Sequence, residues 1–525
     1  MSNLISPFRN LAVLSLSMFL FACASKEKQL PERPNILFIL SDDHTSQAWG
    51  IYGGLLKDYV QNDNIERLAR EGAVLENVFC TNSICTPSRG SILTGQYSHV
   101  NQVYTLNEPL PKGHPNIART FSDNGYQTAI IGKWHLVEPP EGFDHFNVLP
   151  GQGRYWNPIL KTKENWKDGP DGSAGKEYKG FSTDVIADLT IEHLEKRDAG
   201  KPFLMFCNFK ATHEPFDYPE RHKNLYEGLE IPEPESLFDF GKETTGRTFK
   251  GQILEHLADR WKRATEDENF WTSYPGLPYP LEGLDSVQKR KKIYQKLVKD
   301  FMRSGAAIDD NIGKLLDYLE SEGIADNTIV IYTADQGYFL GEHGFFDKRL
   351  IYEESLRMPF VIRYPKEING GQRIDDIILN IDFSALMADY AGIEIPEYIQ
   401  GHSFRENLTG NTPQDWRKQM YYRYWLHHPD RPAHFGIRNE RYKLAFFYGQ
   451  DLGMKGTSKE TTPFAWEFYD LQKDPKELHN AYDEIEYKET IAEMKKALVE
   501  ERKKYRDDDA NYPIMKEILE SVSLN

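Results

Sequence analysis

Apolar residues gather in five short runs along the chain, and longer polar stretches separate these runs. The runs cover residues 35–40, 127–131, 203–206, 328–332 and 359–363. Within each run the apolar residues are continuous rather than alternating, which is typical of strands that are covered on both faces. The pattern therefore predicts a central sheet whose strands are mostly parallel and buried.

Segments with helical spacing lie between several of these runs, at residues 64–71, 183–197 and 287–322. The last segment repeats apolar residues every three or four positions, namely Ile293, Leu297, Phe301, Ile308, Ile312, Leu315 and Leu319. Helices between buried strands predict an α/β fold in which helices cover both faces of the sheet. Residues 160–180 and 220–279 are polar and interrupted by Gly and Pro, so we expect surface insertions there.

The pattern of apolar and polar residues changes after residue 404. Residues 420–425, 434–438 and 442–448 look like antiparallel strands, and a charged helical segment follows them near the end of the chain. We therefore predict a large α/β domain at residues 33–410. A smaller α+β subdomain with an antiparallel sheet is expected at residues 411–525.

The N-terminal segment has the features of an export signal. An apolar run at residues 11–22, too short to span a bilayer comfortably, follows a basic residue. Residues 20–23, Leu-Phe-Ala-Cys, resemble a bacterial lipoprotein cleavage box with Cys23 as the lipidated residue. Plain cleavage near Ala22 or Ala24, with release into the periplasm, is the alternative. Both readings predict an exported protein, either periplasmic or an outer-membrane lipoprotein, and only the lipoprotein reading adds a membrane contact, through its lipid anchor.

Composition narrows the function classes. The chain has 525 residues, 39% of them hydrophobic, and a formal net charge of −17, which is typical of a globular protein. This charge and the lack of a long Lys/Arg run argue against nucleic-acid binding. The four cysteines do not imply a disulfide framework. Cys207 lies in an apolar run and is predicted to be a buried free thiol, whereas Cys80 has no assignment.

Polar residues follow the ends of the predicted strands. In a parallel sheet these ends meet at one edge, where ligands gather. The residues found there are Asp42, Asp43, Lys133, His135, His213, Asp335 and Gln336, with Lys348 further along the chain. The carboxylate and amide oxygens among them suit Ca²⁺, whereas Zn²⁺ is less suited to an oxygen-rich set. The predicted metal ligands are Asp42, Asp43, Asp335 and Gln336.

The segment Cys85-Thr-Pro-Ser-Arg89 predicts a loop that enters a helix. Cys85 would stand at the helix N-terminus and Arg89 one turn later, an arrangement that favours an anion. Taken alone, the segment is compatible with a catalytic nucleophile or with an ordinary buried cysteine.

Several motifs in chain order resemble type I sulfatases of the alkaline phosphatase superfamily. They are Asp42-Asp43, Cys85-Thr-Pro-Ser-Arg89, Gly132-Lys-Trp-His135, His213-Glu-Pro215, Ala334-Asp-Gln-Gly337 and Lys348. The resemblance implies an alkaline phosphatase-like fold, hydrolysis of sulfuric esters, and oxidation of Cys85 to formylglycine by a dedicated maturation enzyme. It also implies a bound Ca²⁺, with position 85 among its ligands. Gln336 departs from the pattern, because many relatives carry Asn or His there.

The resemblance also implies roles for the site residues. Hydrated formylglycine 85, held by Ca²⁺ and Arg89, would attack sulfur. His213 and Lys348 would protonate or stabilise the leaving oxygen, and His135 would deprotonate the second hydroxyl. Lys133, Lys348 and Arg89 would give the acidic molecule a local positive site for an anionic substrate.

Residues 416–443 combine basic, imidazole and aromatic side chains, which is typical of carbohydrate contacts, and His434 and Arg438 are the predicted substrate-binding residues. With export, they predict an exo-acting O-sulfatase of glycosaminoglycan, mucin or algal oligosaccharides. One alternative is a phosphodiesterase or phosphonate monoester hydrolase, because that branch of the superfamily can share the Cys-x-Pro-Ser-Arg motif. Another is a lipoprotein that binds sulfated glycans and is never matured.

Overall fold

The computed structural model describes residues 33–166, 174–238 and 251–522. These residues belong to one compact unit that begins at Arg33, so the predicted boundary at residue 410 separates two parts of the same unit. The predicted export signal and Cys23 lie outside the described residues. Within the described ranges, every helix is too short or too polar to cross a membrane.

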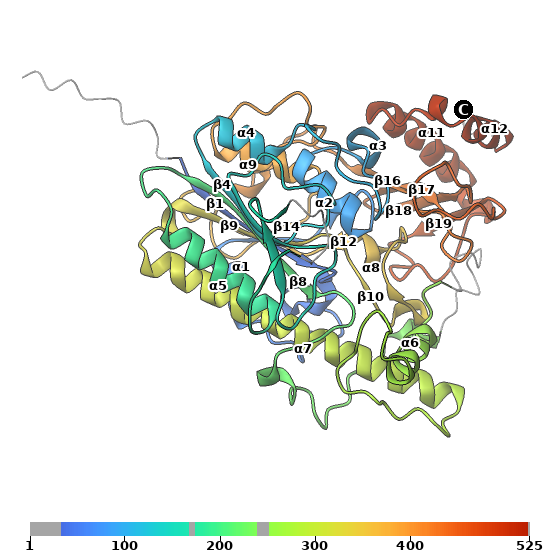
Figure 1. The fold of residues 1–525 in the computed structure, drawn as a ribbon. Helices are drawn as coiled ribbons and strands as arrows, with labels where there is room; N and C mark the ends of the chain where they lie inside the picture. Colours follow the sequence, from blue (N-terminus) through green and yellow to red (C-terminus); the bar gives the residue numbers. More distant parts are fainter. Residues whose placement is uncertain (1–32, 167–173, 239–250, 523–525) are drawn as a thin grey trace, which may run out of the picture. The chain divides into compact units, whose positions relative to one another are not determined.

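A mixed sheet forms the centre of the described chain (Figure 1), with the strand order β14-β2-β13-β9-β1-β8-β4-β5-β6-β7. Its five central strands run parallel to one another. They are β9 (Thr328–Ala334), β1 (Asn35–Asp42), β8 (Phe203–Thr212), β4 (Gln127–Lys133) and β5 (His145–Leu149). Every residue of β1, β8 and β9 is buried. The mostly parallel buried sheet is therefore confirmed.

The strands at the sheet's margins differ from the parallel centre. They are β2 (Ala73–Leu75), β13 (Phe360–Arg363), β14 (Gln372–Ile374), β6 (Ile159–Thr162) and β7 (Lys176–Glu177). The predicted run at 359–363 enters the sheet as β13, antiparallel to β9. The expectation of a surface insertion at 160–180 was wrong in part, because β6 and β7 extend the sheet edge. Strands β6 and β7 are short and partly exposed, so they lack a continuous apolar run.

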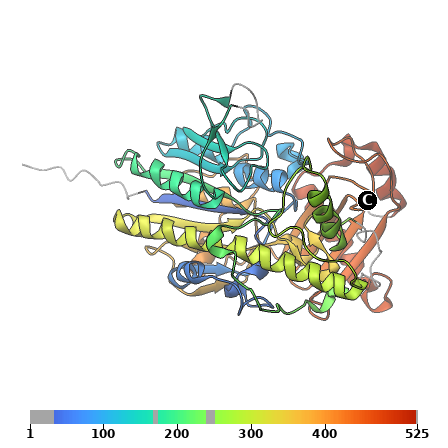
Figure 2. The same ribbon diagram turned by 60° about the horizontal axis from the view of Figure 1, so that its bottom comes forward.

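Helices cover both faces of the sheet (Figures 1 and 2), as predicted. One layer contains α1 (Asp63–Glu71), α5 (Ser182–Glu195) and α7 (Ser286–Ser321). The other contains α2 (Cys85–Thr94), α4 (Ile117–Asp123) and α9 (Asp382–Tyr390). Strand β1 contributes side chains to the hydrophobic cores on both faces of the sheet, because alternate residues of a strand face opposite sides. Phe38 joins the core of the α2 layer, and Leu37 and Ile39 join the core of the α7 layer.

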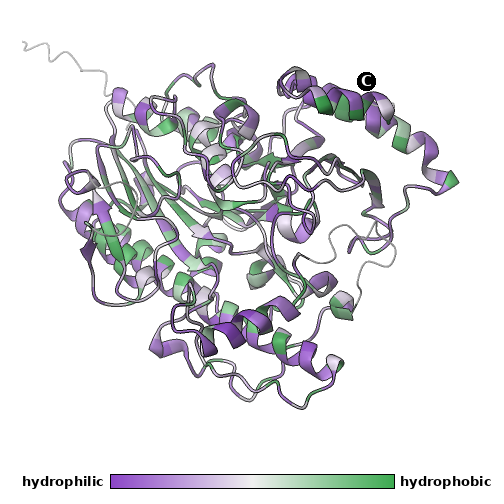
Figure 3. Cartoon of the chain, turned by 45° about the vertical axis from the view of Figure 1, so that its right-hand side comes forward, coloured by the Kyte–Doolittle hydropathy of each residue, from purple (hydrophilic) through white to green (hydrophobic). Residues whose placement is uncertain are grey.

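The C-terminal part contains the predicted antiparallel sheet. Its strands are β16 (Gln419–Tyr424), β17 (His434–Asn439), β18 (Tyr442–Phe447) and β19 (Ala465–Asp470). Helix α11 (Lys488–Lys504) packs on this sheet through Ile491, Met494 and Leu498. Figure 3 shows hydrophilic and hydrophobic residues alternating around the terminal helices, which is the pattern of helices with one buried face.

Residues 220–279 are more than the surface insertion that we expected. They contain α6 (Glu255–Glu266), whose Leu257 and Trp261 are buried against Ile293 and Leu297 of α7. A separate small core therefore holds α6 against the long helix α7. The sequence signal was weak because a short helix carries only a few apolar positions among many charges.

Gly132, near the end of β4, allows the close approach between β4 and β8 that positions the next residue, Lys133. Its φ is +104°, and a Cβ there would lie 2.0 Å from the carbonyl oxygen of Asn208 on the neighbouring strand. Gly125 has a φ of +84° with open space around it. Both Gly→Ala changes carry the backbone cost of positive φ, about 1–2 kcal/mol, but only Gly132→Ala adds a collision.

We therefore expect Gly132→Ala to lower the free energy of unfolding, measured by denaturant titration, by at least about 2 kcal/mol more than Gly125→Ala. Equal losses in the two variants would show that the close approach between β4 and β8 does not constrain this position.

Candidate active site

Three buried carboxylates meet at the carboxyl ends of two neighbouring parallel strands. Asp42 ends β1, Asp43 follows it, and Asp335 follows β9. The backbone N–H of Asp43 donates to Oδ1 of Asp335 over 3.0 Å. One oxygen from each carboxylate lies within 4.8 Å of the others. Parallel pairing of β1 and β9 thus brings together residues that are almost 300 positions apart, as the strand-end argument predicted.

Helix α2 begins at Cys85, which confirms the predicted loop-to-helix entry. The Cys85 Sγ lies 3.8 Å from Oδ1 of Asp43. Burial raises the pKa of the Cys85 thiol, so the unmodified side chain is neutral at physiological pH. One turn later, Nε of Arg89 donates to Oδ2 of Asp335 over 2.9 Å, and Nη1 donates to the carbonyl of Lys133 over 3.0 Å.

Each carboxylate has its own cation. The pairs are Asp42 with Lys133, Asp43 with Lys348 at 2.5 Å, and Asp335 with Arg89. Lys348 follows β11 (Phe346–Asp347), so the cations come from three separate elements. Burial opposes the charge of Asp42, but Lys133 and other nearby positive groups outweigh it and hold the Asp42 pKa well below its usual range. The neighbouring Asp43 carboxylate likewise raises the pKa of Lys348, which therefore stays charged.

The acidic cluster retains capacity for a divalent cation. Burial raises the pKa of Asp43 and raises that of Asp335 to about 7, so the cations present do not fully compensate for lost solvent. Oδ1 of Asp42 and Oε1 of Gln336 are buried and have no hydrogen-bond partner. A bound cation would compensate the buried carboxylate charge and would give a partner to the oxygens that lack one. A donor set made of oxygen atoms fits a hard divalent ion.

Gln336 lies beside this cluster, but with its amide nitrogen turned inward. Nε2 donates to Oδ1 of Asp43 and lies 3.7 Å from the Sγ of Cys85. A half-turn of the amide exchanges its nitrogen and oxygen without changing its shape. The structure thus places Gln336 where a ligand would stand, while the orientation it shows is that of a hydrogen-bond donor.

The two predicted histidines have different positions. His213 follows β8, and its Nδ1 donates to the carbonyl of Glu214 over 2.7 Å. This bond leaves the lone pair of Nε2 facing Oδ2 of Asp43, 3.9 Å away. Burial lowers the pKa of His213 well below its usual range, so the imidazole is neutral. His135 has a φ of +61° and a buried Nδ1 without a partner, and it does not line the pocket described next.

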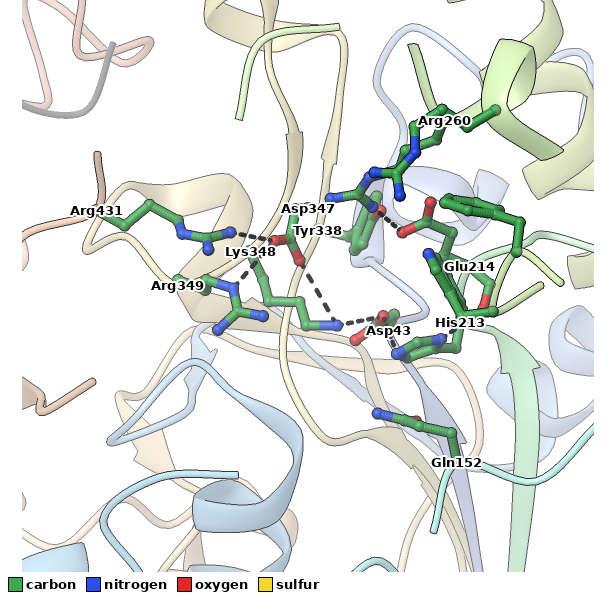
Figure 4. A pocket seen from close by; sticks show the side chains of 13 residues that line it. Asp43, Gln152, His213, Glu214, Arg260, Tyr338, Asp347, Lys348, Arg349 and Arg431 are labelled. Carbon is green, nitrogen blue, oxygen red and sulfur yellow. Dashed lines mark hydrogen bonds and ion pairs between the residues drawn. The ribbon is translucent and has the colours of Figure 1, made fainter. Parts of the chain in front are cut away.

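A pocket of about 400 Å³ leads to this cluster. It is lined by Asp43, Gln152, His213, Glu214, Arg260, Arg263, Phe270, Trp271, Tyr338, Asp347, Lys348, Arg349 and Arg431. In Figure 4, Arg349 and Arg431 lie on one side of Lys348, and Arg260 and Glu214 lie on the other. Five basic and three acidic residues are in this lining, so the entrance is positive although the whole chain is acidic.

Several lining residues were missed from the sequence. Gln152 accepts a hydrogen bond from Lys133 over 2.7 Å, and Asp347 pairs with Arg349 at 3.0 Å and with Arg431 at 3.5 Å. Gln152 lies in a loop and Asp347 in the two-residue strand β11, and a strand-end argument predicts the position of neither. Lys210 was missed as well, although a lysine inside the apolar run of β8 is a visible signal.

Lys210 is buried, with its Nζ 4.9 Å from the ring centroid of Tyr155. Burial, together with the charge of Lys133, lowers the pKa of Lys210 to about 7.

The structure does not bring His434 and Arg438 to this pocket. His434 is fully buried against the rings of Tyr424 and Phe447. Arg438 is also buried and pairs with Glu353 at 3.1 Å. Both side chains contact other parts of the protein rather than this pocket, and their role in glycan binding stays a prediction. Cys80, Cys85 and Cys207 are all buried free thiols.

Comparison with known proteins agrees with this geometry. Residues 34–393 match the family described as Sulfatase, and residues 341–504 match the family described as N-sulphoglucosamine sulphohydrolase, C-terminal.

The chain belongs to the sulfatase family.

Among its relatives is the N-acetylglucosamine-6-O-sulfatase of Bacteroides thetaiotaomicron, with 38% identity over 97% of this chain and 92% of the relative. An arylsulfatase of Clostridium perfringens is 26% identical over 89% of this chain and 94% of its own length. A solved structure, described as a complex with its substrate D-glucosamine-2-N,6-O-disulfate, has a TM-score of 0.80 and 35% identity. It covers 92% of this sulfatase and 100% of the solved chain.

Proposed function

We propose that this sulfatase is an exported enzyme that removes the 6-O-sulfate from glucosamine residues at the ends of sulfated glycans. The observation that carries the proposal is the buried cluster of carboxylates and cations beside Cys85, reached through a pocket with a positive lining. The glucosamine assignment is supported by the relative named for 6-O-sulfated N-acetylglucosamine and by the solved complex with a 6-O-sulfated glucosamine. The apolar N-terminal run followed by Cys23 supports export.

Action at a chain end is supported by the size of the pocket. A volume of about 400 Å³ accommodates a sugar ring and its sulfate group but not a long stretch of polymer. We therefore infer that the terminal sugar enters the pocket and that the rest of the glycan stays outside.

The proposal includes a formylglycine at position 85. A buried neutral thiol is a poor nucleophile, because the thiolate is the reactive form of cysteine. The hydrated aldehyde, when present, supplies a hydroxyl nucleophile at this point. Arg89 and Lys133 flank the position with positive charge, and both are fixed by buried carboxylates. They can therefore hold an anionic sulfate without rearranging.

Calcium is the cation that we propose for the acidic cluster. The predicted donors Asp42, Asp43 and Asp335 each offer a carboxylate oxygen within 4.8 Å of the others, as a hard cation requires. Gln336 would add its amide oxygen after a half-turn of the amide. The charge of the Ca²⁺ would draw the sulfate toward position 85.

Lys348 and His213 are the proposed groups for the leaving oxygen, and they start in different charge states. Lys348 is charged and can donate a hydrogen bond or a proton to the departing alkoxide. His213 is neutral with a free lone pair on Nε2, so it donates from that atom only after it gains a proton near the substrate's anionic sulfate.

The first prediction concerns modification and substrate class. In protein produced with a formylglycine-generating enzyme, residue 85 should lose about 18 Da, one sulfur being exchanged for oxygen with loss of two hydrogens. Cys80, buried five positions earlier, serves as the internal control and should keep its thiol. Peptide mass spectrometry measures both. The matured enzyme should desulfate 6-O-sulfated N-acetylglucosamine, and Cys85→Ala should be inactive.

Two results would contradict this proposal in different ways. A preference of orders of magnitude for aryl phosphate over aryl sulfate would indicate a phosphoester hydrolase. An unmodified Cys85 in protein from its native host, combined with glycan binding and no turnover, would indicate a binding protein.

The second prediction concerns the metal. Excess Ca²⁺ at one hundred times its Kd should stabilise metal-free protein by about 2.7 kcal/mol, seen as a higher Tm. Asp335→Asn should abolish this response, because it removes a charged donor from the cluster. Asp309→Asn is the matched control: Asp309 is a buried carboxylate that accepts backbone N–H bonds from Asn64 and Ile65, away from the cluster. A Ca²⁺ response retained in Asp335→Asn would disprove the assignment.

The third prediction tests whether Lys348 stabilises the leaving oxygen or only maintains the structure of the site. Lys348→Met should lower kcat/KM for the sugar sulfate about 10²–10³-fold, because an alkoxide leaving group needs stabilisation. The loss on an activated aryl sulfate should be at least about tenfold smaller, since its phenolate leaves unaided. Lys296→Met removes another buried lysine, paired with Asp300 outside the pocket, and should change both substrates equally. Equal losses for Lys348→Met would contradict a leaving-group role.

A further inference from the structure

One wall of the pocket comes from the segment that the sequence presented as an insertion. Arg260 and Arg263 of α6, together with Phe270 and Trp271 after it, line this wall. Arg349 and Arg431 line the side beyond Lys348 (Figure 4). The leaving-group chemistry proposed above uses none of the four residues of the α6 wall, so their presence at the entrance needs its own explanation.

The α6 wall, defined here as Arg260, Arg263, Phe270 and Trp271, is fixed to the active site. Arg260 donates to a carboxylate oxygen of Glu214, the residue after His213. The hydroxyl of Tyr274 donates to the other oxygen of Glu214. These bonds and the buried Trp261 hold the wall at a constant distance from the catalytic groups. A ligand group bound by the wall would therefore be held in a defined position relative to the sulfate.

Arg263, unlike Arg260, can direct its positive charge toward a ligand in the pocket. Arg260 is already paired with Glu214. Arg263 stands one turn later on α6, with its guanidinium 4.8 Å from the ring centroid of Phe270. Among the residues that the structure describes, there is no carboxylate within 4.0 Å of it. A guanidinium in a pocket lining without an acidic partner is suited to an anionic ligand group.

Trp271 supplies an apolar surface next to this charge. Its side chain is 61% exposed, although a tryptophan normally buries most of its area. The rings of Phe270 and Tyr274 lie against it, with centroids 5.6 Å and 6.4 Å away. An exposed indole held by neighbouring rings at a pocket entrance offers a flat face to a ligand at little entropic cost. Sugar rings present such a flat face through their C–H bonds.

We propose that Arg263 and Trp271 form a second sugar site, which binds an anionic sugar next to the one that carries the scissile sulfate. This inference rests on the proposed glycan sulfatase function. Trp271 stacks on the ring of the neighbouring sugar, and Arg263 pairs with its negative group, either a carboxylate or a sulfate. The enzyme thus distinguishes an acidic glycan from a free sulfated monosaccharide by binding energy gained at the α6 wall.

Three kinds of substrate test this site with the matured enzyme. The first is 6-O-sulfated N-acetylglucosamine alone. The second is the same sugar linked through its C1 to a uronic acid or, in a separate arm, to a neutral sugar carrying one sulfate. The third is the uronic acid disaccharide with its carboxylate reduced to an alcohol. The measured quantity is kcat/KM for each substrate, at low ionic strength, where a charge contact contributes most.

The wild-type enzyme should prefer an acidic disaccharide to the monosaccharide by about tenfold or more, the effect of one charged contact. Arg263→Gln should remove the difference between the acidic and the reduced disaccharide. Trp271→Ala should lower the ratio of disaccharide to monosaccharide kcat/KM whether or not the neighbour is charged. The arm of the second substrate that shows the larger Arg263 effect identifies the anion as carboxylate or sulfate.

Lys262→Gln is the matched control, because Lys262 is a neighbouring α6 residue whose side chain is 72% exposed and does not line the pocket. It should leave every ratio unchanged. The proposal is overturned if wild-type enzyme treats the acidic disaccharide and the monosaccharide alike, or if Arg263→Gln and Trp271→Ala lower all substrates equally. Failure of the matured wild-type enzyme on every sulfated sugar would instead contradict the proposed function itself.

Discussion

The arrangement of the whole site depends on the need to neutralise three carboxylates that the fold buries at adjacent strand ends. Leaving one such charge unpaired costs several kcal/mol, so each must meet a cation. The cations arrive from α2, from the end of β4 and from the loop after β11. Ion pairs with the three carboxylates thus hold α2, the end of β4 and the loop after β11 at the same place. The same contacts position Cys85, because Arg89 lies one turn along the helix that Cys85 begins.

This constraint also explains how an acidic protein can attract an anionic ester. The net charge of −17 is that of the whole chain, whereas the pocket lining carries more basic than acidic residues. Part of the local positive charge neutralises the buried carboxylates, so only the remainder can attract an anionic substrate. A bound divalent cation would share the carboxylates and release some of that charge toward the sulfate. Basic residues at the entrance, such as Arg349 and Arg431, add attraction that does not depend on the cluster.

The sequence predicted the site best where chemistry coincides with regular structure. Asp42, Asp335 and His213 could be placed because each follows a buried parallel strand, and Cys85 because Pro and Arg mark a helix start. The α6 wall could not be predicted, since its position depends on packing against α7 rather than on strand order. The surroundings of His434 were not predictable for a related reason. The basic and aromatic residues of its segment predicted sugar contacts, whereas in β17 its side chain lies among aromatic rings. Residue type predicts chemistry, whereas burial decides whether that chemistry is available.

Burial also bears on when position 85 can be modified. Only 1% of the Cys85 side chain is exposed, and its thiol lies against the Asp43 carboxylate within the cluster. An enzyme that oxidised this thiol in the folded protein would have to open the contacts of Arg89 and Lys133 with their carboxylates, at a cost of several kcal/mol. An unfolded chain presents the same segment without that cost. The proposed conversion of Cys85 to formylglycine would therefore be least costly before the ionic cluster has folded around this position.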